Sequence, residues 1–459
     1  MAPPRFSAGM RPDLVARYSD QRLPRYTSYP TAPHFAPAVG PDTYAGWLAA
    51  TSASTPTSLY VHVPYCRRMC WYCGCNTSVT QLDQPISAYA GMLRSEIALT
   101  RLHLGKRLPV VHLHFGGGTP TILGPELFVE VMDELHAAFD FRDDAELAIE
   151  IDPRTLTRDM VDAMAGTGIN RVSLGVQSLD PVVQKAINRE QSYFETERAV
   201  GWLRAAGILG INLDLIYGLP HQTEASAVAT VRECMALSPD RIAVFGYAHV
   251  PSFKKHQRKI DESALPGGAE RNRQAEAIGA ALREAGYVAI GIDHYARPDD
   301  PMARAAVDGS LHRNFQGYTT DPASQLIGFG ASAIGRLPQG YVQNDPVVRT
   351  YAQAIAAGRL ATVKGYALTS EDRLRAALIE RVMCDFRVDV GAVCAAHGCR
   401  PQSLGDTLTR LDAMAADGIV TRSGDLIELA PDAHGLARAV AAAFDAHLAN
   451  STRTHAAAL

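Results

Sequence analysis

Short apolar runs alternate with longer segments of helical periodicity between about residues 58 and 296. The apolar runs expected to form strands cover 58–64, 110–117, 146–152, 171–178, 211–220, 241–250 and 287–295. The segments between them include 86–104, 125–139 and 197–207, where apolar residues recur as on an amphipathic helix. Strand–helix–strand repeats of this kind predict an α/β fold with a parallel sheet and crossover helices.

Polar residues recur at every second position in five of the expected strands. The pairs that share one face are Tyr60 and His62, His112 and His114, Glu150 and Asp152, Ser173 and Gln177, and Asn212 and Asp214. Strands of a parallel sheet covered on both faces are almost continuously apolar, whereas alternation places these polar side chains on one side. The pattern favours a curved or barrel-like sheet with an inner site over a flat doubly wound sheet. Isolated buried polar residues are the alternative, and five strands in register argue against it.

The segments on either side of this repeat have a different character. Residues before about 55 are Pro-rich and irregular, which predicts an extension rather than a domain. After about residue 365 the chain becomes helical, and 419–432 has the pattern of a β-hairpin, so a small winged-helix-like module is expected. The expected regions are an N-terminal extension (1–55), a central domain that carries the site (56–360) and a mainly helical C-terminal domain (361–459), with residues 449–459 frayed.

Composition and charge limit the class of protein. The chain has 459 residues and a net charge of −4 at pH 7, which predicts no bulk attraction to nucleic acid or to an anionic membrane. No apolar run approaches the roughly 18 residues of a membrane span. The N-terminus lacks the apolar core of a signal peptide. A cytoplasmic protein is therefore expected.

Four of the eight cysteines lie within ten residues, which indicates metal ligation rather than a disulfide framework. Cys66, Cys70 and Cys73 have C-x3-C-x2-C spacing directly after an expected strand. Thiolates are the ligands of iron–sulfur clusters, and an ordinary cubane takes four, so three would leave one iron open to a cofactor or a substrate. The alternatives are buried free thiols and a zinc site, for which Cys394, His397 and Cys399 could supply further ligands.

The cysteine spacing, with an aromatic residue at Tyr72, resembles that of the radical S-adenosylmethionine (SAM) superfamily. The resemblance implies that SAM fills the open position and is cleaved reductively to a 5′-deoxyadenosyl radical. Glycines within 115–120 allow close backbone approach to a ligand, and in this superfamily a similar run contacts the SAM amino group. Glu150 and Asp152 on the next strand are candidates for the SAM ribose or amino group.

Further motifs narrow the resemblance. The segments 24–31, 60–66, 73–76, 115–121, 149–154, 174–178, 188–191, 212–220, 247–251, 293–300 and 312–320 resemble those of the oxygen-independent coproporphyrinogen III oxidases (coproporphyrinogen dehydrogenases), a radical SAM family. They span about residues 20 to 345, and the C-terminal third is similar more loosely. The family implies a partial (β/α)6 TIM-like barrel with an N-terminal extension and a helical C-terminal domain.

The resemblance also implies cofactors and site residues. One [4Fe–4S] cluster would be held by Cys66, Cys70 and Cys73, beside two SAM molecules. The expected ligands of the first SAM are Tyr60, Tyr72, Gly117, Glu150 and Ile334, and those of the second are Gly118, Thr119, Gln177, Arg189, Asp214 and Ala248. Tyr60 and His62 are the expected catalytic residues. The family often has Phe in place of Tyr72 and Asn in place of Gly246, and the role of Cys75 is open.

The implied reaction is the oxidative decarboxylation of two propionates of coproporphyrinogen III to vinyl groups, giving protoporphyrinogen IX for heme. Hydrogen must leave an unactivated carbon, which requires a cofactor radical. Because the substrate has four carboxylates, cationic and hydrogen-bonding residues should contact it. The candidates are Arg25, Tyr26, Arg297, His312 and Arg313. An electron donor such as flavodoxin or ferredoxin, an unidentified electron acceptor and a monomeric state are also expected.

A heme chaperone of the same superfamily is the main alternative function. Segments 24–31, 73–76 and 312–320 resemble the oxidase, and chaperone-like relatives generally lack them. A radical SAM enzyme that acts on another tetrapyrrole and a plain electron-transfer protein are two further alternatives. The three-cysteine motif and the chain length argue against the last of these.

Overall fold

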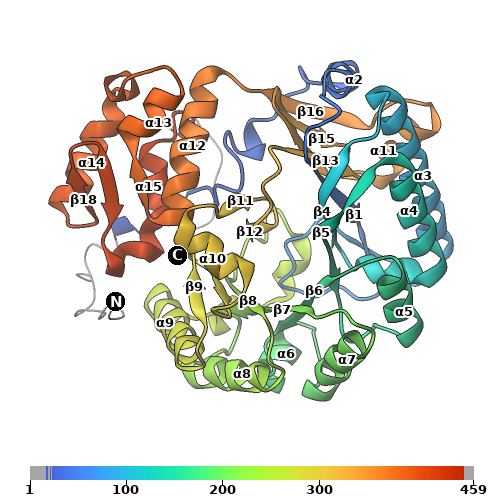
Figure 1. Ribbon diagram of the computed structural model, residues 1–459. Helices are drawn as coiled ribbons and strands as arrows, with labels where there is room; N and C mark the ends of the chain where they lie inside the picture. Colours follow the sequence, from blue (N-terminus) through green and yellow to red (C-terminus); the bar gives the residue numbers. More distant parts are fainter. Residues whose placement is uncertain (1–16, 19–20, 22, 449–459) are drawn as a thin grey trace. The chain divides into compact units, whose positions relative to one another are not determined.

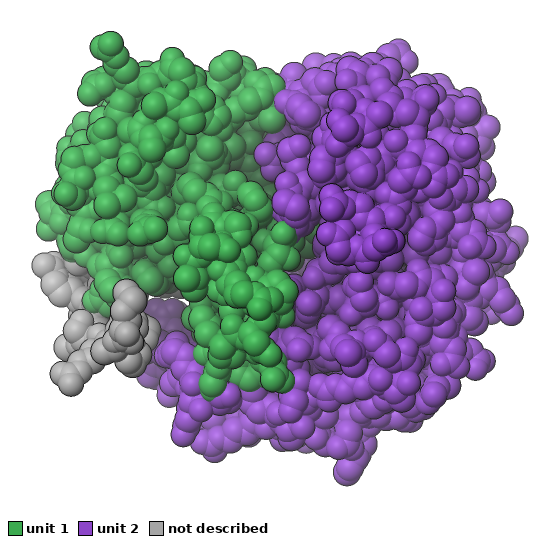
Figure 2. Space-filling model, viewed as in Figure 1, with its two compact units in different colours: residues 1–34, 286–320, 368–459 green, residues 35–285, 321–367 purple. Residues whose placement is uncertain are grey.

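Two compact units make up the described chain, and each is built from segments that are distant in the sequence (Figures 1 and 2). The computed structural model describes residues 17–18, 21 and 23–448. Unit 1 combines the residues up to 34 with 286–320 and those from 368 onward, and unit 2 combines 35–285 with 321–367. The division into 1–55, 56–360 and 361–459 stays a prediction, because the units follow contacts rather than chain order. The expected fraying of 449–459 concerns residues outside the described part.

Unit 2 contains an open barrel of parallel strands. In spatial order these are β1 (Thr57–Val63), β4 (Pro109–Gly117), β5 (Asp140–Ile151), β6 (Arg171–Gln177), β7 (Gly210–Tyr217) and β8 (Arg241–Gly246). Each strand pairs in parallel with the next. The expected strands from 58–64 to 241–250 are all present with shifted ends, and the predicted α/β fold with a partial (β/α)6 barrel is confirmed.

Helices follow these strands and cover the outer side of the sheet (Figure 1). They are α3 (Gln84–Leu104), α4 (Gly124–Ala138), α5 (Arg158–Gly166), α6 (Pro181–Ala186) with α7 (Tyr193–Ala205), α8 (Glu224–Ala236) and α9 (Gly268–Glu284). The hydroxyl groups of Thr157, Ser192 and Thr223 accept hydrogen bonds from free backbone N–H groups where α5, α7 and α8 begin. Apolar residues spaced at helical intervals along α3 are buried, which fixes the helix on the sheet.

The sheet continues from the other side of β1. β13 (Gln325–Phe329) pairs in parallel with β1, and the antiparallel strands β14 (Ile334–Leu337), β15 (Gly340–Asn344) and β16 (Thr362–Ala367) follow it. Helix α2 (Pro41–Ala49) packs against β16, and α11 (Val348–Ala356) packs against α3. The barrel is partial because β13, and not β8, is the second neighbour of β1.

The polar residues of the strands form a hydrogen-bonded row across the sheet. Arg171 on β6 donates to Glu146 on β5 at 2.8 Å and to Asn212 on β7 at 3.0 Å. Ser173, two residues further along β6, donates to Asp214 at 2.9 Å. The alternate residues of β6 are buried apolar side chains. These contacts confirm that one side of the sheet is polar and the other apolar.

Unit 1 holds the C-terminal helices and two small separate sheets. Its helices are α10 (Pro301–Asp308), α12 (Ser370–Asp385), α13 (Val390–Ala396), α14 (Asp406–Ala416) and α15 (Ala437–Ala443). β11 (His312–Asn314) and β12 (Gly317–Thr319) form a hairpin, and β17 (Arg387–Asp389), β19 (Leu426–Leu429) and β18 (Val420–Ser423) form an antiparallel sheet. The hairpin predicted in 419–432 is confirmed by β18 and β19. Across the described residues of both units, no helix is both long and apolar enough for a membrane span.

The expected single strand 287–295 is wrong. Two short strands, β9 (Val288–Ile290) and β10 (His294–Ala296), pair antiparallel with each other instead. The chain reverses at Gly291, whose φ is +56°, and a Cβ atom there would lie 1.9 Å from the ring of Tyr318. Only glycine is compatible with this turn. Because the residues on both sides of the turn are apolar, the sequence pattern predicted one continuous strand.

Candidate active site

The three clustered cysteines lie on one loop that follows β1. Cys66 ends the short strand β2 (Tyr65–Cys66), which pairs with β3 (Ser78–Val79) at the far end of the loop. Asn188 donates from Nδ2 to the carbonyl oxygen of Met69 at 2.8 Å and so holds the middle of the loop. The loop is thus fixed at both ends and at its centre. We call residues 66–76 the cluster loop.

Two of the cysteine sulfur atoms accept hydrogen bonds from neighbours. Oγ1 of Thr119 donates to Sγ of Cys66 at 3.4 Å, and the backbone N–H of Cys75 donates to Sγ of Cys73 at 3.4 Å. The hydrogen bonds from Cys75 lower the pKa of Cys73 to about 7, although burial acts in the opposite direction. Burial raises the pKa of the Cys66 thiol. Cys73 is therefore close to the thiolate form that binds iron.

The third sulfur atom, Sγ of Cys70, lies between two guanidinium groups. Arg189 donates to it from Nη1 at 3.6 Å, and Arg154 donates from Nη2 at 3.7 Å. The same arginines pair with Asp152, at 2.6 Å for Arg154 and 3.5 Å for Arg189. Burial alone would raise the pKa of Asp152, but the two guanidinium groups outweigh it and lower that pKa.

Two of these guanidinium nitrogens are available to a ligand. Nε of Arg189 and Nη1 of Arg154 are buried and have no hydrogen-bond partner among the described residues. A buried donor without a partner costs free energy, and a carboxylate is the group that guanidinium nitrogens bind best. Three thiols with hydrogen-bond donors around them, beside two unused cationic donors, fit an iron–sulfur cluster and an anionic cofactor group.

The glycine run at the end of β4 brings its backbone against the cluster loop. The N–H of Gly118 donates to the carbonyl oxygen of Val63 at 2.8 Å. Gly117 has a φ of +114°, and a Cβ atom there would lie 2.6 Å from the imidazole of His62. A Cβ atom at Gly118 would lie 2.5 Å from the carbonyl oxygen of Tyr65. Both positions require glycine, which leaves the backbone open at the edge of the site.

Glu150 on β5 faces the glycine run. Its carboxylate accepts from the N–H of Gly117 at 3.2 Å and from Nε2 of His114 at 3.2 Å. Burial would raise the pKa of Glu150, but the hydrogen bond and charge of His114 and the N–H of Gly117 lower it. Glu150 is therefore an ionised, partly exposed carboxylate, which can bind an ammonium group or sugar hydroxyls.

Tyr60 and His62 form a neutral hydrogen-bonded chain on β1. Oη of Tyr60 lies 3.0 Å from Nδ1 of His62, and Nε2 of His62 lies 2.9 Å from the carbonyl oxygen of Asn76. Because a carbonyl oxygen only accepts, Nε2 carries the proton and Nδ1 accepts from Tyr60. Burial lowers the pKa of His62 and raises that of Tyr60, so both groups remain uncharged.

The other predicted cofactor residues lie in the same part of unit 2. Gln177 ends β6 with a φ of +68°, a left-handed conformation that non-glycine residues adopt mainly at functional sites. Asp214 lies on β7, Ala248 follows β8, and Ile334 is the first residue of β14. Tyr72, on the cluster loop, packs against a buried apolar cluster. The cluster loop, the glycine run, Gln177 and Ala248 thus lie at or beyond the carboxyl ends of barrel strands, where the sites of such folds lie, whereas Asp214 lies within β7 and Ile334 lies on β14.

A cavity of about 430 Å³ adjoins the cluster loop. Cys66, Thr119, Asp152 and Arg154 contribute to its wall. The cavity therefore gives access to one of the three cysteines and to one of the two arginines beside Cys70.

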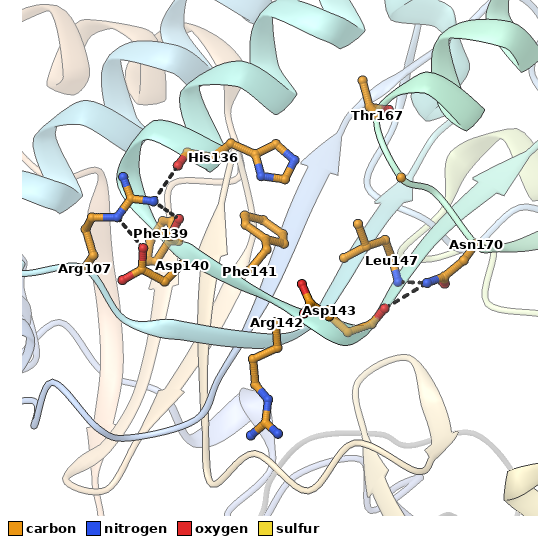
Figure 3. Close-up of a pocket in the computed structure, with 12 residues that line it drawn as sticks. Arg107, His136, Phe139, Asp140, Phe141, Arg142, Asp143, Leu147, Thr167 and Asn170 are labelled. Carbon is orange, nitrogen blue, oxygen red and sulfur yellow. Dashed lines mark hydrogen bonds and ion pairs between the residues drawn. The ribbon is translucent and has the colours of Figure 1, made fainter.

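A second cavity, of about 500 Å³, lies where β5 begins, at the opposite end of the strands (Figure 3). Arg107 on its wall donates to Asp140 at 2.6 Å and to the carbonyl oxygen of His136 at 2.9 Å. Asn170 donates to the carbonyl oxygen of Ala145 at 2.8 Å. These polar groups hold the backbone of unit 2, and none of the predicted site residues lines this cavity.

The five predicted substrate residues all belong to unit 1, where two of them are close to one carboxylate. Arg313 is buried, with its guanidinium carbon 4.4 Å from the ring centre of Tyr318 and its Nη1 3.8 Å from Asp293. Burial would raise the pKa of Asp293, but the charges of Arg313 and Arg25 are among those that lower it. Arg313 is therefore held beside Asp293, which His294 also contacts at 2.7 Å.

The other three substrate candidates are engaged separately in unit 1. The contacts are Tyr26 with Asp445 at 3.0 Å, His312 with Glu380 at 3.2 Å, and Arg297 with Asp299 at 3.3 Å. Sequence reasoning missed Arg154 and Asp293 as members of these charged groups. Both lie inside segments that carry the family resemblance, 149–154 and 293–300, so these two motifs could have indicated that Arg154 and Asp293 belong to the site.

Comparison with known proteins decides the family. Residues 60–234 match the model of the Radical SAM superfamily. The oxygen-independent coproporphyrinogen III oxidase of Bradyrhizobium diazoefficiens is 58% identical over 450 residues, covering 98% of this chain and 100% of the relative. The chain belongs to the oxygen-independent coproporphyrinogen III oxidases. The Paracoccus denitrificans oxidase is 45% identical over 428 residues, which is 93% of this chain and 95% of that relative.

A solved structure supports the same assignment of this oxidase. Coproporphyrinogen III oxidase (HemN) from Escherichia coli, a radical SAM enzyme, is 36% identical with a TM-score of 0.88, and the match covers 93% of this chain and 100% of that one. The family and the fold predicted from the motifs are confirmed. As a radical SAM enzyme, this oxidase uses SAM and a [4Fe–4S] cluster. The zinc-protein and plain electron-carrier alternatives are thereby set aside.

Proposed function

We propose that this oxidase converts two propionate side chains of coproporphyrinogen III to vinyl groups and so forms protoporphyrinogen IX without oxygen. The proposal is carried by the three-cysteine loop with unused guanidinium donors beside it, in a chain that matches a coproporphyrinogen oxidase over 98% of its length. Each propionate loses one hydrogen atom, one electron and CO2. The reaction therefore needs a radical and an electron acceptor.

The cluster would be held by Cys66, Cys70 and Cys73, which leaves one iron for SAM. The cluster held by these cysteines would supply the electron for the reductive cleavage of SAM, and the resulting radical would take hydrogen from the substrate. The carboxylate of Glu150, which accepts from the N–H of Gly117, would bind the amino group or the ribose of the first SAM. The other residues proposed around that SAM are Tyr60, Tyr72, Gly117 and Ile334.

A second SAM is proposed beside Arg189, whose buried Nε has no partner among the described residues and suits a carboxylate. Its other proposed contacts are Gly118, Thr119, Gln177, Asp214 and Ala248. Tyr60 and His62 are proposed as catalytic residues, because the imidazole of His62 lies directly under Gly117 and the neutral chain through Tyr60 fixes its orientation. In this role Tyr60 and His62 would hold the first SAM in position without gaining or losing a proton.

The substrate is proposed to contact Arg25, Tyr26, Arg297, His312 and Arg313. Arg25 and Arg313 are the stronger candidates, because the charges of both act on Asp293, and the buried Nε of Arg313 has no hydrogen-bond partner among the described residues and suits a propionate. We further propose that a flavodoxin or ferredoxin donates the electrons and that an unidentified acceptor receives them. The enzyme is proposed to be monomeric and cytoplasmic, with no nucleic-acid or membrane partner. Its proposed regions are 1–55, 56–360 and 361–459.

Anaerobic turnover tests the function. The cluster is reconstituted, the protein is incubated with SAM, a low-potential reductant, coproporphyrinogen III and an electron-accepting cell extract, and tetrapyrroles are followed by liquid chromatography and mass spectrometry. Loss of two CO2 per macrocycle in the wild type but not in Cys70→Ala is expected. SAM cleavage without decarboxylation would indicate another substrate. Stoichiometric heme binding with an intact cluster and no SAM-dependent product would favour the heme chaperone instead.

A further inference from the structure

A basic surface adjoins the cluster loop in a chain that is acidic overall. Segments 65–82 and 247–260 together contain six Lys and Arg residues and no Asp or Glu, whereas the whole chain has 44 Lys and Arg against 48 Asp and Glu. The six residues are Arg67, Arg68, Lys254, Lys255, Arg258 and Lys259. We call this set the cluster-side basic surface.

Hydrogen bonds link the two segments directly. The short helix η3 (Lys255–Lys259) begins next to Lys254, whose Nζ donates to the carbonyl oxygen of Cys75 at 2.9 Å. Nε2 of His256 lies 2.7 Å from the carbonyl oxygen of Cys73. These bonds fix the cations of η3 beside the backbone of the third cluster cysteine.

Four of the six cations are exposed: Arg68, Lys255, Arg258 and Lys259. Phe253, directly before them, is 70% exposed. The acidic residues that flank the two segments have partners of their own: Asp83 with Arg67, Asp261 with Ser263, and Glu262 with His249. Exposed cations with an exposed aromatic residue beside them suit a protein partner of opposite charge.

We propose that the cluster-side basic surface docks the protein that reduces the cluster, and that this protein is a one-electron carrier with acidic residues around its redox group. The inference rests on the proposed function, because only a cluster that must be reduced before SAM is cleaved needs such a donor. One electron leaves the carrier and one enters the cluster, and no bond is made or broken in the docking step. Opposite charges speed such encounters, and salt weakens them.

The test compares two double charge reversals in the reconstituted holoenzyme. Lys255→Glu with Arg258→Glu changes the docking surface, and it spares the cluster loop because Lys254 and His256 make the bonds to that loop. Arg101→Glu with Arg232→Glu is the matched control, since both residues are exposed and lie toward the C-terminal ends of α3 and α8, away from the carboxyl ends of the strands. A purified acidic bacterial flavodoxin is the probe. Its binding in the oxidised form is measured by calorimetry, and its oxidation from the reduced form by stopped-flow absorbance.

At a low salt concentration of about 20 mM, the Lys255/Arg258 variant should lose about tenfold or more in both affinity and rate, and the loss should shrink at about 500 mM salt. The Arg101/Arg232 control should stay within about twofold of the wild type. Equal losses in the two variants, or no loss in the first, would overturn the docking surface. Iron content and circular dichroism show that each variant is folded and loaded.

A small reductant separates this inference from the proposed function. With titanium(III) citrate, SAM cleavage in the Lys255/Arg258 variant should equal that of the wild type, because no protein has to dock. A cleavage defect that persists with this reductant would assign the two residues to the site itself and overturn the docking role. If the wild type cleaves SAM but leaves coproporphyrinogen III unchanged, the proposed substrate is wrong, and the flavodoxin affinities still decide the docking surface.

Discussion

Replacing Gly117 with alanine should destabilise unit 2 through two separable effects. Its φ of +114° costs any other residue about 1–3 kcal/mol. A Cβ atom would also lie 2.6 Å from the His62 ring, which is held by Tyr60 at 3.0 Å and by the Asn76 carbonyl at 2.9 Å. Moving the ring would break both hydrogen bonds, each worth about 0.5–1.5 kcal/mol. The expected loss in the free energy of unfolding is therefore about 2–6 kcal/mol.

Tryptophan fluorescence measures this unit selectively, because Trp47, Trp71 and Trp202 all lie in unit 2. Urea unfolding of the cofactor-free protein, followed by this signal, gives the change in the free energy of unfolding. Gly105→Ala is the matched control. Gly105 has a φ of +65° with open space around a Cβ atom, so this variant should lose only the backbone cost of about 1–2 kcal/mol.

A double-mutant cycle separates the two effects. In a His62→Ala background the ring that the new Cβ atom would strike is absent, so Gly117→Ala should cost about as much as Gly105→Ala does. An equal cost of Gly117→Ala in the two backgrounds would refute the steric argument. A cost below that of Gly105→Ala in the wild-type background would refute the backbone argument as well.

Changes at the cluster, at Arg189 and at Glu146 test other parts of the site. Cys70→Ala should lose iron and visible absorbance after anaerobic reconstitution while Cys399→Ser keeps both, and full iron content in Cys70→Ala would contradict the ligand assignment. Arg189→Gln should weaken SAM binding, measured by equilibrium dialysis, by about 10–100-fold, since a hydrogen bond to a charged group is worth about 1.5–3 kcal/mol; unchanged affinity would remove Arg189 from that site. Burial would raise the pKa of Glu146, but His112, Arg241 and Arg171 hold it well below its usual value of 4.5. A depressed carboxyl pKa stabilises the folded state above the unfolded pKa, and this stabilisation is lost as the pH falls through the folded value. Glu146→Gln should therefore flatten the fall in unfolding free energy below about pH 4.5, and an identical acid limb in the variant would speak against the assignment.

The barrel could be predicted because each strand carries its own signal. On β6 the buried residues alternate with Arg171 and Ser173, and the polar partners of these two, Glu146 and Asp214, come from the neighbouring strands. Alternation within one strand needs no knowledge of the rest of the chain. The same rule failed at 287–295, where the turn at Gly291 depends on the distant ring of Tyr318.

The site could be predicted only where the type and spacing of the residues indicate their chemistry. Three cysteines and a glycine run indicate their chemistry from spacing alone. In contrast, the contacts that hold the cluster loop, from Asn188 to Met69 and from His256 to Cys73, join backbone carbonyls to single side chains on other segments, a loop and the short helix η3. Such contacts depend on the path of two irregular segments, which no periodicity in the sequence records.

The cations inside the site are already paired with acids, so the attraction of an acidic carrier would come from the cluster-side basic surface. Around the cluster loop, Arg154 and Arg189 pair with the carboxylate of Asp152, and the carboxylate of Glu150 accepts from the N–H of Gly117. Cations that are paired inside the site add little to the attraction of an acidic carrier, because opposite charges in contact largely cancel each other at a distance. In the proposed docking, the exposed cations on η3 would attract the acidic carrier from outside the site. Because Lys255 and Arg258 make none of the hydrogen bonds that hold the cluster loop, substitutions there should change docking without changing cofactor binding.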